Sequence, residues 1–204
     1  MKNTNLFFKM GILFFVILAI LSYFYFDKII AEFFHTHIIG KIKHYIKIFS
    51  KLGQAEYYLI PSIILYFIYK NKNEFIKKAS LLIFASVAVS GILVDIIKII
   101  VARYRPPAFF SDNLYGFKGF DIGFLVNSFP SGHSATALSA GVALMYIFPK
   151  YKYLFLFIAI LIAFSRIFLA VHYFSDIIIG SLIGALTSIY LYNKIFKEKD
   201  EVRL

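Results

Sequence analysis

The sequence predicts an all-α integral membrane protein: a six-helix bundle with an amphipathic interfacial helix after its first span. Of the 204 residues, 60% are hydrophobic and only 16% are charged, whereas a soluble domain is about half apolar and a quarter charged. The apolar residues gather in long runs, which indicates that a bilayer solvates the helices. The length fits a single transmembrane domain covering residues 1–204.

Six apolar runs are the predicted spans, although several are shorter than the ~20 residues that a crossing needs before tilt and flanking residues are counted. They lie near residues 6–26, 52–69, 79–101, 134–148, 153–171 and 174–192. The first, fifth and sixth runs are apolar nearly all round, which disfavours a soluble bundle, whose helices carry a polar stripe. The first run follows Lys2, as a signal peptide would, but bulky residues at its end offer no cleavage site. We therefore interpret it as a retained span.

The segment after the first run, Asp27–Lys51, interleaves apolar and basic residues with helical spacing. This pattern is typical of an amphipathic helix that lies among lipid headgroups, and interfacial anchoring alone accounts for it. A second interpretation is that its basic residues guide an anionic lipid toward a site. Gly40 is the position at which the segment could divide into two pieces.

The formal net charge of +11 comes largely from lysines that flank the apolar runs. This placement favours anionic headgroups as the partner and disfavours nucleic acid. With six spans, the termini and the second and fourth connections share one side, which we assign to the cytoplasm because it is rich in Lys and Arg. That side carries Lys2, Lys70, Lys72, Lys77, Lys78, Lys150, Lys152, Lys194, Lys197, Lys199 and Arg203. The chain has no cysteine, which excludes disulfides and thiolate metal sites.

Polar groups at one predicted end of the spans carry the candidate chemistry, because ionisable residues are costly to bury in a membrane and are usually functional there. Lys98 and Arg105 are seven residues apart, so on one helix they share a face, before Pro106 and Pro107 end that helix. Two cations on one face can clamp an oxyanion. Two cations that snorkel to the interface would give the same pattern.

The second group is Pro130, Ser131, Gly132 and His133, directly before the fourth span. Amides at a helix start attract anions. The Ser131 hydroxyl adds a donor, Gly132 permits close approach of the backbone, and His133 can titrate near neutral pH. An ordinary helix-start turn with an incidental histidine would contain the same residues.

The third group is Ser165 and Arg166, followed by His172 and Asp176. His172 and Asp176 are four residues apart, so on one helical turn their side chains can meet. A carboxylate that accepts from one imidazole N–H fixes the tautomer and leaves the other nitrogen as a nucleophile. A His–Asp pair in a solvated turn is the alternative. Together the three groups supply the cations, amides, histidines and carboxylate that phosphoryl transfer requires.

This pattern resembles the complete three-part signature of the type 2 phosphatidic acid phosphatase superfamily, and the apolar spans resemble its membrane lipid phosphatases. The signature positions are Lys98, Arg105 and Pro106, then Pro130, Ser131, Gly132 and His133, then Ser165, Arg166, His172 and Asp176. The motifs cover residues 98–176, and the six-span layout extends the resemblance across the chain.

The resemblance implies a role for each residue. His172 attacks phosphorus and forms a phosphohistidine, Asp176 orients His172, and His133 protonates the leaving oxygen and then activates water. The phosphate oxygens are held by Lys98, Arg105, Ser131, Gly132 and Arg166. The resemblance also implies a reaction without a metal or other cofactor, in keeping with spans that offer no carboxylate cluster suited to magnesium.

The predicted function is a metal-independent phosphatase in a bacterial inner (cytoplasmic) membrane, with its active site on the periplasmic face. Candidate substrates are undecaprenyl diphosphate, phosphatidylglycerol phosphate, phosphatidic acid and the lipid A phosphates. The irregular connection at 108–129 is predicted to roof the site and to help choose the lipid, although its phenylalanines would equally anchor an interface. An anion transporter and a catalytically inactive lipid-binding protein remain as alternatives, and the oligomeric state is not predicted.

Overall fold

The structure, a computed structural model, describes residues 2–197, and its regular elements in that range are helical apart from one isolated bridge between Arg103 and Phe117. The helices are α1 (Lys2–Leu21), α2 (Asp27–His37), α3 (Gly40–Ser50), α4 (Glu56–Tyr69), α5 (Glu74–Val101), α6 (Pro106–Asp112), α7 (Gly132–Ile147), α8 (Lys152–Phe168) and α9 (Phe174–Tyr192). The all-α class is therefore confirmed.

Four helical stretches are long and apolar enough to cross a bilayer: Leu6–His37, Glu74–Val101, Pro149–Phe168 and Phe174–Phe196. By contrast, α4 has 14 residues and α7 has 16, fewer than the ~20 that a straight crossing needs. These stretches make the chain an integral membrane protein. The count of six spans remains a prediction.

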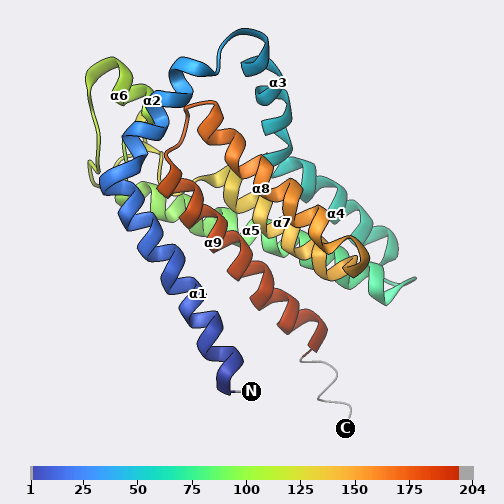
Figure 1. Cartoon of the computed structure of the whole chain (residues 1–204). Helices are drawn as coiled ribbons and strands as arrows, with labels where there is room; N and C mark the ends of the chain where they lie inside the picture. Colours follow the sequence, from blue (N-terminus) through green and yellow to red (C-terminus); the bar gives the residue numbers. More distant parts are fainter. Residues whose placement is uncertain (1, 198–204) are drawn as a thin grey trace.

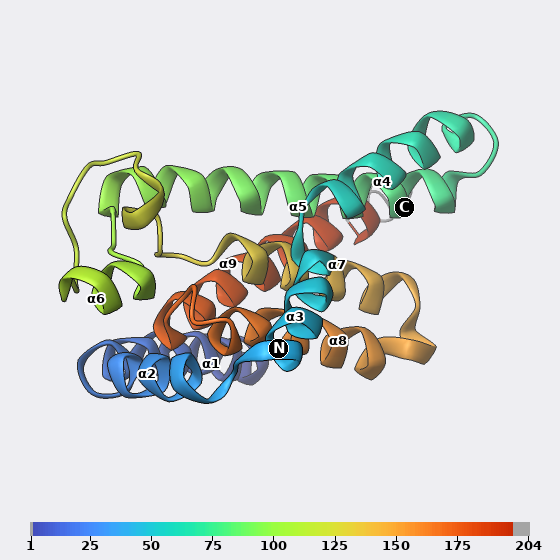
Figure 2. The same cartoon turned by 90° about the horizontal axis from the view of Figure 1, so that it is seen from above.

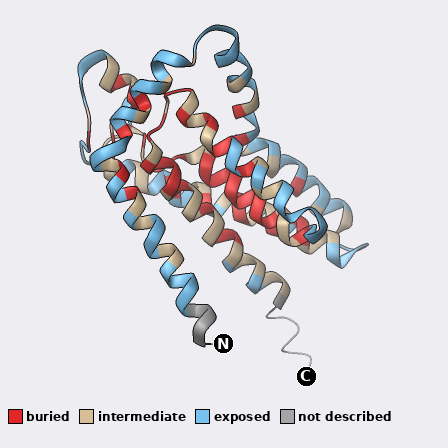
Figure 3. Cartoon of the chain, in the orientation of Figure 1, coloured by how far each residue is buried: buried red, intermediate tan, exposed pale blue. Residues whose placement is uncertain are grey.

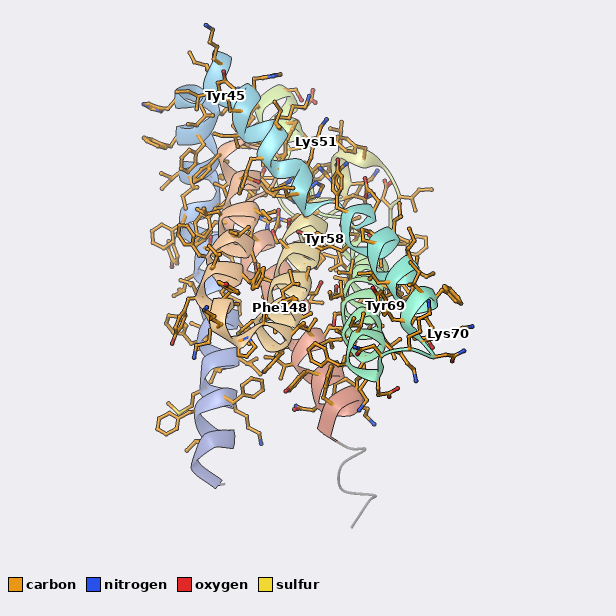
Figure 4. All side chains as sticks on the ribbon, turned by 90° about the vertical axis from the view of Figure 1, so that its right-hand side faces the viewer. Tyr45, Lys51, Tyr58, Tyr69, Lys70 and Phe148 are labelled. Carbon is orange, nitrogen blue, oxygen red and sulfur yellow. The ribbon has the colours of Figure 1, made fainter. Side chains whose placement is uncertain are left out.

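The two ends of the helical bundle carry different helices and connections. Figure 1 shows the start of α1 and the end of α9 together at one end, and α2, α3 and α6 at the other. In Figure 4, Lys70 and Phe148, which mark the α4–α5 and α7–α8 connections, lie away from Tyr45 and Lys51 of the α3 region. Side chains of Lys2, Lys197, Lys199 and Arg203, on which the predicted orientation partly depends, lie outside those that the structure describes.

Helix α7 forms the centre of the bundle and contacts α5, α8 and α9. It is mostly buried (Figure 3) and rich in Ala, Ser and Gly. Seen from above, α4 and α5 lie on one side of it and α1 and α2 on the other (Figure 2). A Cβ on Gly184 of α9 would lie 2.2 Å from the Ala135 carbonyl oxygen, and a Cβ on Gly141 would lie 2.6 Å from Ala159 Cβ. Such close packing suits membrane helices, which associate largely through van der Waals contact between small residues.

The first span is longer than predicted. A π-helical turn, Ser22–Phe26, joins α1 directly to α2, so the first half of the expected interfacial segment continues the first helix. Asp27 is consequently 1% exposed, and its carboxylate accepts a hydrogen bond from Ser22 Oγ at 2.6 Å. The predicted division at Gly40 is present, at a φ of +57° that glycine adopts without strain. Only the second half of the segment forms a helix that is not continuous with the first span. This helix, α3, is exposed and basic, and its place at the membrane interface remains a prediction.

Candidate active site

The three polar groups of the sequence converge at the end of the bundle that carries α2, α3 and α6. The pKa of His133 is lowered to about 3, first by burial and then by the charges of Arg166, His172, Lys98 and Arg105. Charges influence one another in this way only at short range. The structure therefore gathers His133 and His172 into one site together with Lys98, Arg105 and Arg166. These three cations are called the cation cluster below.

Lys98 and Arg105 reach this site from different elements, so the prediction that one helix presents both is wrong. Helix α5 ends at Val101, and Ala102 caps it in the left-handed conformation with a φ of 42°. Pro106 lies at the start of α6 and does not end α5, since a proline at a first helical position has no N–H to lose. The chain thus turns between the two cations.

Arg105 directly precedes α6, just before the connection 108–129 that was predicted to roof the site. Its Nη2 donates to the backbone oxygen of Asn127 at 3.1 Å, and its guanidinium lies 4.3 Å from the Phe124 ring centroid. Lys98 lies in the last turn of α5, where its Nζ is 3.3 Å from Asp95 Oδ1. Asp95 is exposed, with 72% of its side chain accessible, so this ion pair is a weak one.

The start of α7 brings its backbone close to Lys98. Ser131 is the N-cap residue, and its Oγ accepts from Ser134 N at 3.4 Å and from Ser134 Oγ at 2.8 Å. The Ser131 N–H donates to the backbone oxygen of Asp176 at 3.0 Å, which ties α7 to α9. A Cβ on Gly132 would lie 3.1 Å from Lys98 Nζ, so glycine leaves room for the ammonium group beside the first turn of the helix.

His172 lies between α8 and α9 with 2% exposure. Its Nδ1 is 2.8 Å from the Ser128 carbonyl oxygen and 3.5 Å from Asp176 Oδ2. Both neighbours are acceptors, so Nδ1 carries the proton and Nε2 keeps its lone pair. Burial lowers the pKa of His172 to about 3 despite the opposing hydrogen bond to Asp176, so the ring is neutral. The sequence predicted the carboxylate but could not reveal the nearer acceptor, because that acceptor is a backbone oxygen.

Asp176 is fully buried in the first turn of α9. Its Oδ2 accepts from Ser128 Oγ at 2.5 Å and from the backbone N–H of Tyr173 at 2.9 Å. Its Oδ1 accepts from Arg103 Nη1 at 2.5 Å. These donors leave the carboxylate little freedom to rotate, and they hold it ionised.

Arg103 is a residue that the sequence analysis missed. It is 0% exposed and bridges two carboxylates, because Nη1 donates to Asp176 and Nη2 donates to Asp27 Oδ2 at 2.7 Å. Ser175 completes this Arg103 cluster, since its backbone N–H donates to Asp27 at 3.0 Å and its Oγ accepts from Arg103 at 2.6 Å. Burial lowers the pKa of Arg103, but Asp176 and Asp27 outweigh this effect and raise it above its ordinary value.

Asp27 was missed as well, because its segment was interpreted as an interfacial helix. The available signals were an acidic residue where the first apolar run ends and an arginine two positions before Arg105. Neither signal has a meaning until the fold pairs the two residues, which are 76 positions apart. The first helix thereby contributes to the scaffold of the site.

Arg166 occupies the last turn of α8, and its Nη1 donates to Ser50 Oγ of α3 at 2.7 Å. The turn after α3 packs against His133, since a Cβ on Gly53 would lie 3.0 Å from His133 Cδ2. Helix α3 and this turn therefore help to enclose the site. Ser50 is another contact that the sequence did not reveal.

The cation cluster is short of negative charge. Among the described residues, no ion pair includes Arg105 or Arg166, and both have a buried Nε that finds no partner there. Buried cations are costly unless an anion or a set of acceptors compensates them. The arrangement therefore suits an anion with several oxygen atoms, such as a phosphate group.

Comparison with known proteins decides the family, because the family model of the PAP2 superfamily matches residues 79–200. The chain belongs to the PAP2 superfamily. It is 30% identical to the lipid A 1-phosphatase of Rhizobium johnstonii over 160 residues. The aligned region covers 72% of this chain and 66% of that protein. It is also 30% identical over 141 residues to the undecaprenyl-diphosphatase of Sulfolobus acidocaldarius, or 68% of this chain and 64% of that protein. The chain thus spans about two thirds of the length of these PAP2 relatives.

Two solved PAP2-type structures share the fold. Aquifex aeolicus LpxE superposes with a TM-score of 0.60 at 23% identity, over 82% of this chain and 94% of that one. A transmembrane PAP2-type phosphatidylglycerolphosphate phosphatase from Bacillus subtilis gives 0.61 at 22% identity, over 92% and 96%. The family suggested by the signature is confirmed, and the predicted enzyme class, a phosphatase, agrees with the names of these relatives.

Proposed function

We propose that this PAP2 protein is an integral membrane lipid phosphatase that acts through a phosphohistidine. The observation that carries the proposal is the setting of His172, whose Nδ1 faces the Ser128 carbonyl and Asp176 while the charges of Arg105 and Arg166 act on the ring. A neutral imidazole with one nitrogen fixed as a donor leaves the other as a nucleophile. The domain comprises residues 1–204, with its chemistry between 98 and 176.

In the first step, His172 Nε2 attacks the phosphorus atom of the lipid phosphate, and the bond from phosphorus to the leaving oxygen breaks. His133 donates a proton to that oxygen. The negative charge of the bound phosphate raises the pKa of His133 from its low value, which allows the ring to hold this proton. In the second step, His133 accepts a proton from water, the water oxygen attacks the phosphohistidine, and inorganic phosphate and neutral His172 are released.

The remaining site residues stabilise the charge of the transferring group. Lys98, Arg105 and Arg166 neutralise the phosphate oxygens, and the Ser131 hydroxyl and the Gly132 amide add donors at the start of α7. Because phosphoryl transfer depends mainly on positioning and on electrostatic stabilisation, these groups can act without a metal. The Arg103 cluster has a supporting role, since it fixes the carboxylate that orients His172.

The substrate is a lipid phosphate or diphosphate: a lipid A phosphate, undecaprenyl diphosphate, phosphatidylglycerol phosphate or phosphatidic acid. The relatives named above favour lipid A and undecaprenyl diphosphate as the first lipids to test. Purified protein in detergent with EDTA should release inorganic phosphate from at least one of these four lipids.

The His172→Ala variant should release no phosphate, and His44→Ala, an exposed histidine of α3, serves as its matched control. With a lipid labelled with ³²P in the phosphate, the wild-type protein should retain an acid-labile label that His172→Ala lacks. Equal phosphate release by wild type and His172→Ala would reject the mechanism.

We further propose that the site faces the periplasm of a bacterial inner membrane. The chain has no cysteine, so single cysteines report cleanly. Asp112→Cys at the end of α6 should react with an impermeant thiol reagent in cells with a permeabilised outer envelope. Asn71→Cys, between α4 and α5, should react only after lysis. The reverse pattern would invert the orientation.

A further inference from the structure

A second basic pocket adjoins the candidate active site. It has a volume of about 620 Å³ and lies between α2, α3, α6 and the end of α8. Its polar and charged lining comes from His35, Lys43, Lys47, Ser111 and Arg166. Arg166 also belongs to the cation cluster, and Val171 in the lining directly precedes His172, so the pocket and the candidate active site share a wall.

The pocket is positive and lacks compensating carboxylates. None of its lining residues is acidic. Lys43 and Lys47 stand one helical turn apart on α3, both are exposed, and no ion pair among the described residues includes either. A point charge on a flexible stem can follow an anionic group over several positions, so the two lysines suit a ligand oxygen inside the pocket.

The walls of the pocket are held in place by contacts across it. Arg166 Nη1 donates to Ser50 Oγ, which fixes the end of α3 against α8. The rings of His35 and Phe110 stack at 4.0 Å, which joins α2 to α6. The volume lies within the range of pockets that hold a small ligand, about 300–1,000 Å³, and it exceeds what one phosphate group needs.

We propose that this pocket binds a second anionic group of the lipid substrate, one that is not hydrolysed, while the cation cluster holds the reacting phosphate. This inference rests on the proposed phosphatase function and specifies its substrate class as lipids with two anionic groups in the headgroup. The same chemistry could come from an anionic bystander lipid, and the experiment below separates the two sources.

The test compares two lipids with identical acyl chains in neutral detergent micelles: phosphatidylglycerol phosphate, which has a second phosphate, and phosphatidic acid, which has none. The wild-type protein should have the higher kcat/KM for phosphatidylglycerol phosphate. The double variant Lys43→Ala/Lys47→Ala should lose about tenfold in kcat/KM for that lipid, mainly through KM, and less than about twofold for phosphatidic acid. Lys43→Arg/Lys47→Arg should retain the preference.

The matched control is Lys41→Ala/Lys72→Ala, which removes two charges at exposed residues that do not line the pocket. This control should keep the wild-type ratio between the two lipids. Equal losses on both lipids, no loss on either, or a loss in the control as large as in the pocket variant would overturn the inference. So would a loss that arises only when phosphatidylglycerol is added as a bystander, because that result assigns the lysines to bulk headgroups.

Binding provides a readout that does not need turnover. The His172→Ala protein should bind phosphatidylglycerol phosphate more tightly than phosphatidic acid, and adding Lys43→Ala/Lys47→Ala should remove the difference. A wild-type protein that hydrolyses none of the lipids tested counts against the proposed function. Equal binding of the two lipids by His172→Ala counts against the pocket.

Discussion

Two arginine environments lie side by side in this protein, and they differ in how their charge is compensated. Arg103 sits between the carboxylates of Asp27 and Asp176, whereas Arg105 and Arg166 donate only to neutral oxygens among the described residues. A compensated buried cation holds a shape, because any displacement exposes unpaired charge. An uncompensated cluster favours a ligand that brings the missing negative charge.

The pKa values of Arg103 and Arg105, which are only two positions apart, shift in opposite directions. Burial lowers the pKa of both Arg103 and Arg105, but Asp176 and Asp27 reverse the effect at Arg103 and raise its pKa above the ordinary value. At Arg105 burial prevails over Asp176, and the pKa is lowered. One side chain is thus electrostatically satisfied by the protein, and the other is not. Four predictions test this picture, from the largest expected effect on phosphate release to the smallest.

Removing the compensated arginine should damage the fold. Arg103→Ala leaves two carboxylates buried without their cation, and breaking a buried pair in this way costs about 3–5 kcal/mol. Thermal unfolding in detergent should show a sharply lowered Tm, and phosphate release should be lost with it. A wild-type Tm in Arg103→Ala would mean that the cluster does not stabilise the protein.

Removing an uncompensated arginine should affect activity instead of stability. Arg105→Ala should lower kcat/KM for phosphate release about 10²–10³-fold, the loss typical when one group that stabilises the transition state is removed. Its Tm should equal or exceed that of the wild type, since a costly buried charge is relieved. Arg105→Lys, which keeps the charge but not the fork of donors, should lie between the two.

A milder substitution tests whether the first membrane helix, through Asp27, helps to position Asp176. Asp27→Asn keeps the shape but removes one of the two negative charges beside Arg103, which should lower kcat about tenfold with little change in KM, because Asp176 is then less firmly placed. The Tm should fall by an amount that corresponds to about 1–3 kcal/mol. Glu32→Gln, at an exposed acidic residue five positions further along α2, is the control. A change in KM alone would contradict a positioning role.

The last prediction concerns the pH dependence of stability and not phosphate release. Neutral His172 has its pKa lowered from 6.5 to about 3 by burial, so its contribution to the free energy of unfolding is present above pH 6.5 and is lost as the pH falls toward 3. The Tm should therefore decrease between pH 6.5 and 4, and it should do so less steeply in His172→Gln. Parallel curves for the two proteins would show that His172 is not the group responsible.

The sequence predicted helix bounds best where they depend on residues that are close together in the chain. The last predicted span, 174–192, has the bounds of α9, because a mostly apolar run without proline follows the turn at His172 and Tyr173. The first predicted span was too short, because Asp27 and Lys28 resemble an interface when their partners are unknown. The relation between Lys98 and Arg105 was misjudged for a similar reason, since the left-handed cap at Ala102 leaves no mark in the sequence.

By itself, the sequence determined the membrane environment, the family and the set of groups that carry the candidate chemistry, because composition and motif spacing are properties of the chain. Only the tertiary structure decided which charges compensate one another. Arg103 bonds with Asp176, 73 positions away, and with Asp27, 76 positions away, and a pairing over such separations exists only once the helices have packed. The backbone oxygen of Ser128 that faces His172 belongs to the same class, since every residue has a carbonyl and only the fold aims one at a ring.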